Sequence, residues 1–251
     1  MATDYDRISR EYQLSKLQPW RQFAEAHTFF NLVGDLSGKK VLDLACGDGF
    51  YTRQLKLRGA AAVVGVDISK GMIDLARASE AEHPLDITYH IQNVLDLDLN
   101  EQFDLITASY LLNYASNIAE LTAFVKVIAT HLKPGARFVT INSNPDYESP
   151  VETIRKYGFT RENESRNEGS KITYRLYQED GSHIEVVNFH LEKSTHEHCL
   201  ESAGLSNVKW HPLELDPSIV DETSQEFWKA LIESQPVIGL TCQSNPSSQK
   251  N

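Results

Sequence analysis

The sequence of 251 residues has no apolar run that approaches the roughly 20 residues needed for a membrane-spanning helix. It has only three cysteines, and Cys46, Cys199 and Cys242 lie far apart without a C-x-x-C pair. That pattern argues against a zinc site or a disulfide framework, so we expect a reducing, cytoplasmic compartment. The first twelve residues, which mix charges and contain no apolar stretch, do not resemble a secretory signal.

Basic residues are also scarce. There are 24 Lys and Arg against 35 Asp and Glu, and the formal net charge is −11. An acidic surface repels phosphate backbones, and no cluster of Lys and Arg offsets that repulsion locally. We therefore expect a small-molecule substrate, with neither nucleic acid nor a membrane as partner, for a protein that is a monomer or a homodimer.

What the sequence does contain is a regular alternation of strand and helix patterns between Lys39 and Asn142. The short apolar runs are KVLDLA, AAVVGVD, ITYHIQ, FDLITAS and ARFVTIN. Such runs, separated by segments with apolar residues at helical spacing, predict an α/β, doubly wound, mostly parallel sheet. With two later strands, the prediction is a Rossmann-like sheet of seven strands. Lys133-Pro134-Gly135 is expected to end the last of these helices.

We predict a single domain over residues 1–242. Its expected parts are a helical lid (1–38), a cofactor-binding core (39–142), a substrate cap (143–193) and the last part of the sheet (194–242). The cap is predicted from two alternating runs, KITYRLYQ and HIEVVNFHL, that interrupt the α/β pattern. Residues 243–251 are polar and are expected to form a disordered tail.

The sharpest motif is VLDLACGDGFYT at residues 41–52, in which an apolar strand runs into a turn and then a helix. Gly47 and Gly49 let the backbone approach a ligand closely, and the start of the helix offers unpaired N–H groups. About 20 residues on, Asp67 ends the second strand, where a carboxylate can accept hydrogen bonds from two ribose hydroxyls. The segment therefore predicts a nucleoside-containing cofactor.

The same features occur in dinucleotide sites, which use the pattern G-x-G-x-x-G. Here Ala45 takes the first position and Thr52 stands where a third glycine would fall. Asp43, in the strand before the turn, is costly to bury unless it is hydrogen-bonded or meets a cation. We expect it to hold N–H groups of the turn or to meet a sulfonium cofactor, since a pyrophosphate would be repelled.

In order along the chain, DLACGDG, VGVDIS with GMIDLA, QNVLDL, FDLITASYLLNY and LKPGARFV resemble the motifs of class I S-adenosylmethionine-dependent methyltransferases. The resemblance covers residues 5–242. It implies methyl transfer to a nitrogen, oxygen or carbon of a small, planar or heterocyclic metabolite. Within that superfamily, SKLQPWR, GDGFYTRQLK, LLNYA and FWKALIESQPVIGL are most similar to the toxoflavin-pathway N-methyltransferases, which points to secondary metabolism.

The resemblance also implies a set of residues that bind S-adenosylmethionine. They are Tyr12 and Arg21 at the methionine carboxylate, Ala45, Cys46 and Gly47 along the methionine part, Asp67 at the ribose, Ile68 and Met72 against the adenine, Asn93 and Val94 at the adenine edge, and Ala108 at the methionine end. Asn93 stands where the family usually has Asp, and either side chain accepts from an adenine amino group.

Three residues are candidates for catalysis. His190, at the end of a predicted cap strand, is a candidate general base, with an ordinary half-exposed histidine as the alternative. Tyr110 and Asn113 follow the fourth strand, at the sheet edge where α/β sites open. His196 and His198 are two residues apart on a predicted helix, so their side chains diverge and no metal site is expected.

Two other classes of function fit parts of the sequence. One is a catalytically silent S-adenosylmethionine-binding interaction protein, and the other is a nicotinamide-dependent reductase. The lack of a catalytic triad does not argue against an enzyme, because an in-line displacement on a sulfonium releases a neutral thioether. Positioning the nucleophile in line with the methyl group supplies most of the acceleration in such a reaction.

Overall fold

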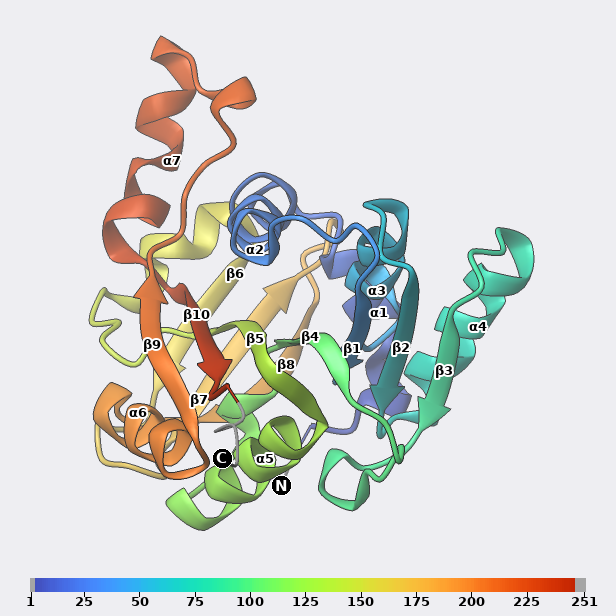
Figure 1. The fold of residues 1–251 in the computed structure, drawn as a ribbon. Helices are drawn as coiled ribbons and strands as arrows, with labels where there is room; N and C mark the ends of the chain where they lie inside the picture. Colours follow the sequence, from blue (N-terminus) through green and yellow to red (C-terminus); the bar gives the residue numbers. More distant parts are fainter. Residues whose placement is uncertain (1–2, 247–251) are drawn as a thin grey trace.

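The computed structural model describes residues 3–246, apart from the side chains of residues 222 and 223 (Figure 1). Its main sheet has seven strands in the order β3-β2-β1-β4-β5-β10-β9. The neighbours from β3 to β5 pair in parallel, whereas β10 is antiparallel to both β5 and β9. The strands are β1 (Lys40–Leu44), β2 (Ala62–Asp67), β3 (Thr88–Ile91), β4 (Phe103–Ser109), β5 (Leu132–Ser143), β9 (Leu205–His211) and β10 (Val237–Ser244). The predicted Rossmann-like sheet is confirmed.

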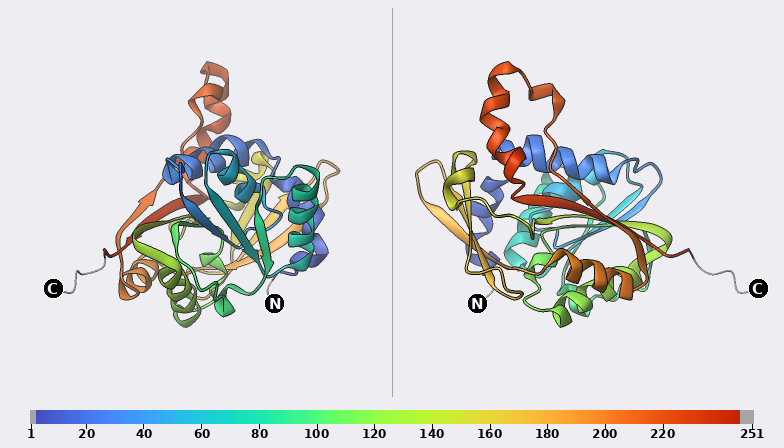
Figure 2. Two further views of the ribbon diagram at one scale, coloured as in Figure 1. Left: turned by 45° about the vertical axis from the view of Figure 1, so that its right-hand side comes forward. Right: turned by 90° about the vertical axis from the view of Figure 1, so that its left-hand side faces the viewer.

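Helices cover both faces of this sheet (Figure 2). They are α2 (Ala26–Val33), α3 (Phe50–Leu57), α4 (Lys70–Glu82), α5 (Ile118–His131) and α6 (Lys193–Ser202), whereas α7 (Glu222–Ser234) projects beyond the sheet. Alternate strand residues point to opposite faces: Val41 packs in the same core as Phe29 of α2, and Leu42 in the core that contains Val125 of α5. Short helical turns are η2 (Val94–Asp96), η3 (Leu112–Tyr114) and η5 (Pro217–Ile219).

The chain before β1 begins with α1 (Tyr5–Ser15), which contacts α4 and the cap. The next segment, η1 (Arg21–Glu25), is a π-helix that leads directly into α2. π-Helical turns are rare and are frequently found at functional sites. The segment predicted as a lid is therefore helical, with a π-helical turn between α1 and α2.

The cap is a separate antiparallel sheet in the order β6-β7-β8, preceded by η4 (Val151–Tyr157). Its strands are β6 (Phe159–Asn163), β7 (Lys171–Tyr177) and β8 (His183–Phe189). The sequence predicts β7 and β8 but not β6, because the polar residues Arg161-Glu162-Asn163 hide its alternation. In the structure, Phe159 and Arg161 pair with Leu176 and Tyr174 of β7.

Two predicted boundaries differ from the structure. The last helix ends slightly earlier than predicted: α5 ends at His131, and Lys133-Pro134-Gly135 already lie in β5, which begins at Leu132. The three residues form an irregular start of β5, where the register with β4 shifts. The predicted tail begins too early, because Gln243 and Ser244 belong to β10, and residues 247–251 lie outside the described part of the chain.

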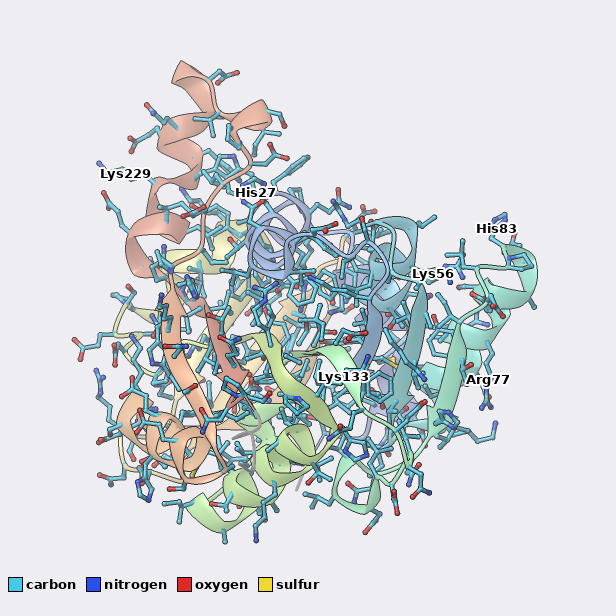
Figure 3. All side chains as sticks on the ribbon, viewed as in Figure 1. His27, Lys56, Arg77, His83, Lys133 and Lys229 are labelled. Carbon is cyan, nitrogen blue, oxygen red and sulfur yellow. The ribbon has the colours of Figure 1, made fainter. Side chains whose placement is uncertain are left out.

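None of the helices formed by the described residues is long and apolar enough to cross a membrane. The basic side chains labelled in Figure 3, Lys56, Arg77, Lys133 and Lys229, lie on separate elements and do not gather on one face.

Candidate functional site

The turn after β1 is held open by backbone geometry and by Asp67. Gly49 has a φ of 78°, and a Cβ there would lie 2.5 Å from Tyr89 Oη, so only glycine fits. The Gly47 N–H donates to Asp67 Oδ2 (2.8 Å), and the Ser69 N–H donates to Asp67 Oδ1 (2.8 Å). Asp67 thus ties the turn to the start of α4 while each of its oxygens keeps acceptor capacity for a ligand hydroxyl.

Asp43 has a different role from the one predicted. It is buried and accepts hydrogen bonds from the hydroxyls of Thr52 (2.7 Å) and Thr107 (2.8 Å), and the turn N–H of Gly47 goes to Asp67 instead. Burial raises the pKa of Asp43 to about 6, although both threonine hydrogen bonds favour the carboxylate. Asp43 therefore joins β1 to α3 through Thr52 and to β4 through Thr107.

A cavity of about 230 Å³ opens over the turn and the carboxyl ends of β2 and β4. Its walls include the predicted cofactor residues Tyr12, Ala45, Gly47, Asp67, Ile68, Met72, Asn93 and Val94. Cys46 lies in an adjoining hollow that shares Ala45 and Gly47 with this cavity. Ala108 is fully buried and is not among the lining residues. Most of the predicted set is brought together on one cavity.

The groups on this cavity fit S-adenosylmethionine. The exposed side chain of Ile68 and the buried Met72 give an apolar wall for a base, with Asp67 beside it for a ribose. Asn93 uses its Oδ1 to accept from the Leu95 N–H (3.0 Å), which leaves its amide N–H groups for a ligand. Ser109 Oγ is buried on the cavity wall without a hydrogen-bond partner, as expected for a group that hydrogen-bonds a ligand.

Lys16 is a site residue that the sequence reasoning missed. It is 7% exposed, and it lines the hollow formed by Asp43, Ala45 and Gly47. Its ammonium lies 5.2 Å from the centroid of the Tyr51 ring, and within the described chain it has no ion-pair partner. The basic residue in SKLQPWR was the available signal, but nothing local showed that α1 would carry it onto the turn.

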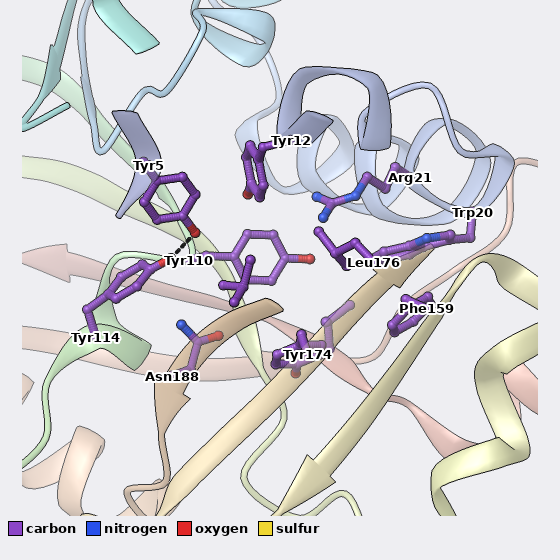
Figure 4. Close-up of a pocket in the computed structure, with 12 residues that line it drawn as sticks. Tyr5, Tyr12, Trp20, Arg21, Tyr110, Tyr114, Phe159, Tyr174, Leu176 and Asn188 are labelled. Atoms are coloured by element: carbon purple, nitrogen blue, oxygen red, sulfur yellow. Dashed lines mark hydrogen bonds between the residues drawn. The ribbon is translucent and has the colours of Figure 1, made fainter. Parts of the chain in front are cut away.

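A second chamber adjoins the cofactor cavity, between the lid and the inner face of the cap sheet (Figure 4). Tyr5, Tyr12, Tyr110 and Tyr114 line both spaces. The remaining walls are Trp20, Arg21, Phe159, Tyr174, Leu176, Val186, Asn188 and Val237. No carboxylate is among these lining residues. The chamber is therefore a largely aromatic space of about 30 Å³ that shares four tyrosines with the cofactor cavity, and a ring-sized acceptor enters it only if its walls move apart.

Arg21 belongs to this chamber and is not among the residues that line the cofactor cavity. Its Nη1 lies 3.4 Å from Oε1 of Glu25, which is fully buried. Glu25 also accepts from the hydroxyl of Tyr51 (2.6 Å) and from that of Tyr110. Burial opposes the charge of Arg21, but Glu25 and the surrounding tyrosines outweigh it and raise the pKa of Arg21.

The predicted catalytic residues do not converge. Tyr110 lines both cavities, whereas Asn113 is buried outside them with both ends of its amide unbonded. His190 lies in a surface pocket beside Arg166 and Lys193, and burial followed by Arg161 lowers its pKa. His190 is thus not among the residues that surround the cofactor cavity or the chamber, and Tyr110 alone of the three is.

The lid is fastened over the cofactor cavity by Asp6 of α1. Asp6 Oδ1 accepts from Ser69 Oγ (2.6 Å) and from the Gly71 N–H (2.8 Å) at the start of α4, and these bonds lower its pKa. Tyr5 and Tyr12 of the same helix line the cavity, so we expect that a bound cofactor leaves only when α1 moves.

We expect Asp6→Ala to speed the dissociation of S-adenosylhomocysteine roughly tenfold, because one to two kcal/mol of charged hydrogen bonding is lost. Stopped-flow fluorescence measures the rate. Asp4→Ala is the matched control, since Asp4 precedes the same helix but caps no N–H group. A dissociation rate equal to that of the parent would show that α1 does not gate release.

Comparison with known proteins supports the interpretation of this cavity as the cofactor site of a methyltransferase. Residues 41–135 match the family model of a methyltransferase domain. A ubiquinone biosynthesis O-methyltransferase of Coxiella burnetii is 38% identical over 200 residues, which cover 76% of this chain and 76% of that protein. The enzyme of the same name from Stutzerimonas stutzeri is 32% identical over 146 residues, 56% of this chain and 59% of the relative, or less than two thirds of its length.

Among solved structures, the CcbJ methyltransferase of Streptomyces caelestis aligns with a TM-score of 0.69 at 19% identity, covering 97% of this chain and 98% of that one. This likeness shows a common fold. The sequence identity to the Coxiella burnetii relative shows, in addition, that the chain belongs to the same family. A nicotinamide-dependent reductase does not fit this family. The chain belongs to the class I S-adenosylmethionine-dependent methyltransferases.

Proposed function

We propose that this enzyme transfers the methyl group of S-adenosylmethionine to a hydroxyl oxygen on a small aromatic ring. The observation that carries the proposal is the chamber, whose walls are mainly aromatic and which meets the cofactor cavity along four shared tyrosines. A flat acceptor packs favourably against aromatic rings such as those of Tyr110 and Tyr114. The ubiquinone biosynthesis relatives, named as O-methyltransferases, support oxygen as the accepting atom.

The cofactor supplies a methyl group on a positively charged sulfur, and the residues of the chain orient and enclose it. We assign Asp67 to the ribose, Ile68 and Met72 to the faces of the adenine, and Asn93 to its edge. Tyr12 lies at the junction of the two cavities. Since the acceptor then lies in line with the methyl group, most of the acceleration comes from alignment and exclusion of water. His190 has no part in this assignment.

A ring nitrogen is the second candidate for the accepting atom. It rests on the resemblance of SKLQPWR and the C-terminal FWKALIESQPVIGL to the toxoflavin-pathway N-methyltransferases, and it would place the enzyme in secondary metabolism. In either case the three buried free cysteines fit a cytoplasmic enzyme.

Methyl transfer from labelled cofactor to a panel of phenols, catechols, hydroquinones and nitrogen heterocycles tests the function. We expect label in methyl ethers of the hydroxylated rings. Label only in N-methyl products would select the second candidate. Cofactor binding without any labelled product across the panel would favour the silent binding protein.

The Leu176→Trp variant tests whether the chamber and the cofactor cavity are separate binding sites. Leu176 is buried on β7, and it lines the chamber but not the cofactor cavity. We expect the larger ring to fill the chamber and to reduce turnover at least about tenfold, while the affinity for S-adenosylhomocysteine stays within about twofold. An equal loss of cofactor affinity would show that the two spaces are not separate sites.

A further inference from the structure

We propose that Tyr110 and Glu25 form a proton relay that removes the proton of the acceptor hydroxyl. The proposal rests on the proposed O-methylation and adds the group that accepts the proton. A phenol attacks carbon faster as its oxygen gains negative charge, so a positioned base accelerates the reaction. No carboxylate or imidazole is among the residues that line the chamber, and the base must be reached through another side chain.

Tyr110 provides that connection. Figure 4 shows its ring in the middle of the chamber, between Tyr12 and Tyr174. Its hydroxyl donates a hydrogen bond to Glu25 Oε2, so its oxygen can accept a hydrogen bond from an acceptor in the chamber. Burial, followed by the nearby Glu25 charge, raises the pKa of Tyr110 well above its ordinary value. The residue therefore remains a neutral hydroxyl that passes a proton on.

Two backbone features hold this pair in an unusual conformation. Tyr110 has a φ of 68°, in the left-handed region that bulky residues rarely adopt, and its N–H is bonded to Ile141 O (2.8 Å). Glu25 is the last residue of the π-helix η1. Strained backbone and single π-helical turns both concentrate at functional sites. In this structure the left-handed backbone of Tyr110 directs its hydroxyl group, and the π-helical turn places the Glu25 carboxylate that accepts from that hydroxyl.

The groups that face Glu25 come from each element around it. Arg21 lies on the same turn, Tyr51 donates from α3, and Tyr110 donates from the loop after β4. Lys16, directly after α1, adds a second cation whose ammonium lies 5.2 Å from the Tyr51 ring centroid and 6.0 Å from that of Tyr110. Two cations and two hydroxyl donors therefore surround the fully buried carboxyl group of Glu25. In the proposed relay this group, as a carboxylate, accepts the proton.

The proposed step balances. A lone pair of the acceptor oxygen forms the bond to the methyl carbon as the methyl–sulfur bond breaks and its electron pair stays on sulfur. The acceptor proton passes to Tyr110 Oη while the proton of Tyr110 passes to Glu25 Oε2. The products are a methyl ether, a neutral thioether and a neutral Glu25 carboxylic acid. Glu25 returns its proton to solvent when the lid opens.

The test uses 4-nitrocatechol, whose ionised form absorbs visible light, bound to the enzyme with S-adenosylhomocysteine. If Glu25 takes the proton, the bound probe is ionised at a pH where the free probe is mainly neutral, and Glu25→Gln abolishes that absorbance. If Glu25 stays ionised as a bystander, its charge disfavours the phenolate, and Glu25→Gln increases the absorbance. The two mechanisms predict changes of opposite sign.

Tyr110→Phe is the second variant, because it leaves the Arg21–Glu25 pair in place and interrupts the relay. Its matched control is Tyr147→Phe, which removes a buried hydroxyl that has no partner and lies outside the residues lining either cavity. We expect Glu25→Gln and Tyr110→Phe to slow methylation of catechol by roughly 10²-fold or more. The deficit should shrink for 4-nitrocatechol, which ionises more readily, whereas Tyr147→Phe should behave as the parent.

Failure of the relay differs from failure of the proposed function. A parent enzyme that methylates catechols while both variants keep its rates and its probe spectrum would overturn the relay alone. If the parent neither binds the probe in the presence of S-adenosylhomocysteine nor methylates a hydroxylated ring, the proposed function fails, and the relay fails with it.

Discussion

Lys16→Met is expected to weaken the binding of S-adenosylhomocysteine by roughly 10- to 100-fold, the equivalent of one charged hydrogen bond. Lys16 is almost fully buried against the turn after β1, and its ammonium has no salt bridge within the described chain. Asp43 of the same hollow interacts with Lys16 electrostatically but not as a direct ion pair, and a buried cation without a direct pair is costly. We infer that the α-carboxylate at the methionine end of the cofactor supplies the missing charge, in place of the role that the sequence assigned to Arg21.

The same reasoning predicts an effect of opposite sign on the free protein. Methionine fills a volume similar to that of lysine without carrying a charge, so removing an unpaired buried cation should leave the melting temperature unchanged or raise it. A cofactor-binding loss that merely reflected damage to the fold would instead come with a lower melting temperature. Lys70→Met is the control, because Lys70 is exposed on α4 and pairs only with Asp74.

Calorimetry with two ligands locates the contact. 5′-Methylthioadenosine has the adenine and ribose of the cofactor but lacks the amino-acid part. Lys16→Met should bind it as tightly as the parent does, while its affinity for S-adenosylhomocysteine falls. Equal losses for both ligands would place Lys16 away from the carboxylate and would restore Arg21 as the candidate.

The cofactor side of the site was predictable because its geometry is local. The turn needs glycine where a Cβ would meet Tyr89, and an acid at the end of the second parallel strand necessarily lies beside that turn. Each of these constraints depends on a few consecutive residues and can therefore be recognised in the sequence. The same holds for the strands of the main sheet, whose apolar runs are continuous because both faces are covered.

The acceptor side was not predictable in the same way, because it is built by tertiary docking. Glu25 looks like any acid in a helical segment, and only the packing of η1 against α3 and the loop after β4 shows that it is buried among Arg21, Tyr51 and Tyr110. His190, by contrast, has a suggestive position in sequence, yet the cap turns it towards the surface pocket by α6. A pattern read along one element does not reveal which neighbour covers it.

The Asp67→Ala variant is expected to show the complementary ligand profile. Asp67 combines two functions, since its oxygens hold the Gly47 and Ser69 N–H groups and also face the cavity. Its alanine variant loses the ribose contacts and releases the turn, at a combined cost of about 2–3 kcal/mol in cofactor affinity, or roughly 30- to 150-fold. Burial raises the pKa of Asp67, and the two backbone hydrogen bonds oppose that rise.

Because the ribose is present in both ligands, Asp67→Ala should weaken 5′-methylthioadenosine as strongly as S-adenosylhomocysteine, unlike Lys16→Met. Asp67→Asn should recover part of the loss, since an amide oxygen still accepts from one N–H group. Asp74→Ala, an exposed acid on α4, controls for the general loss of negative charge. Affinity within about twofold of the parent for both ligands would mean that Asp67 shapes the turn without touching the ribose.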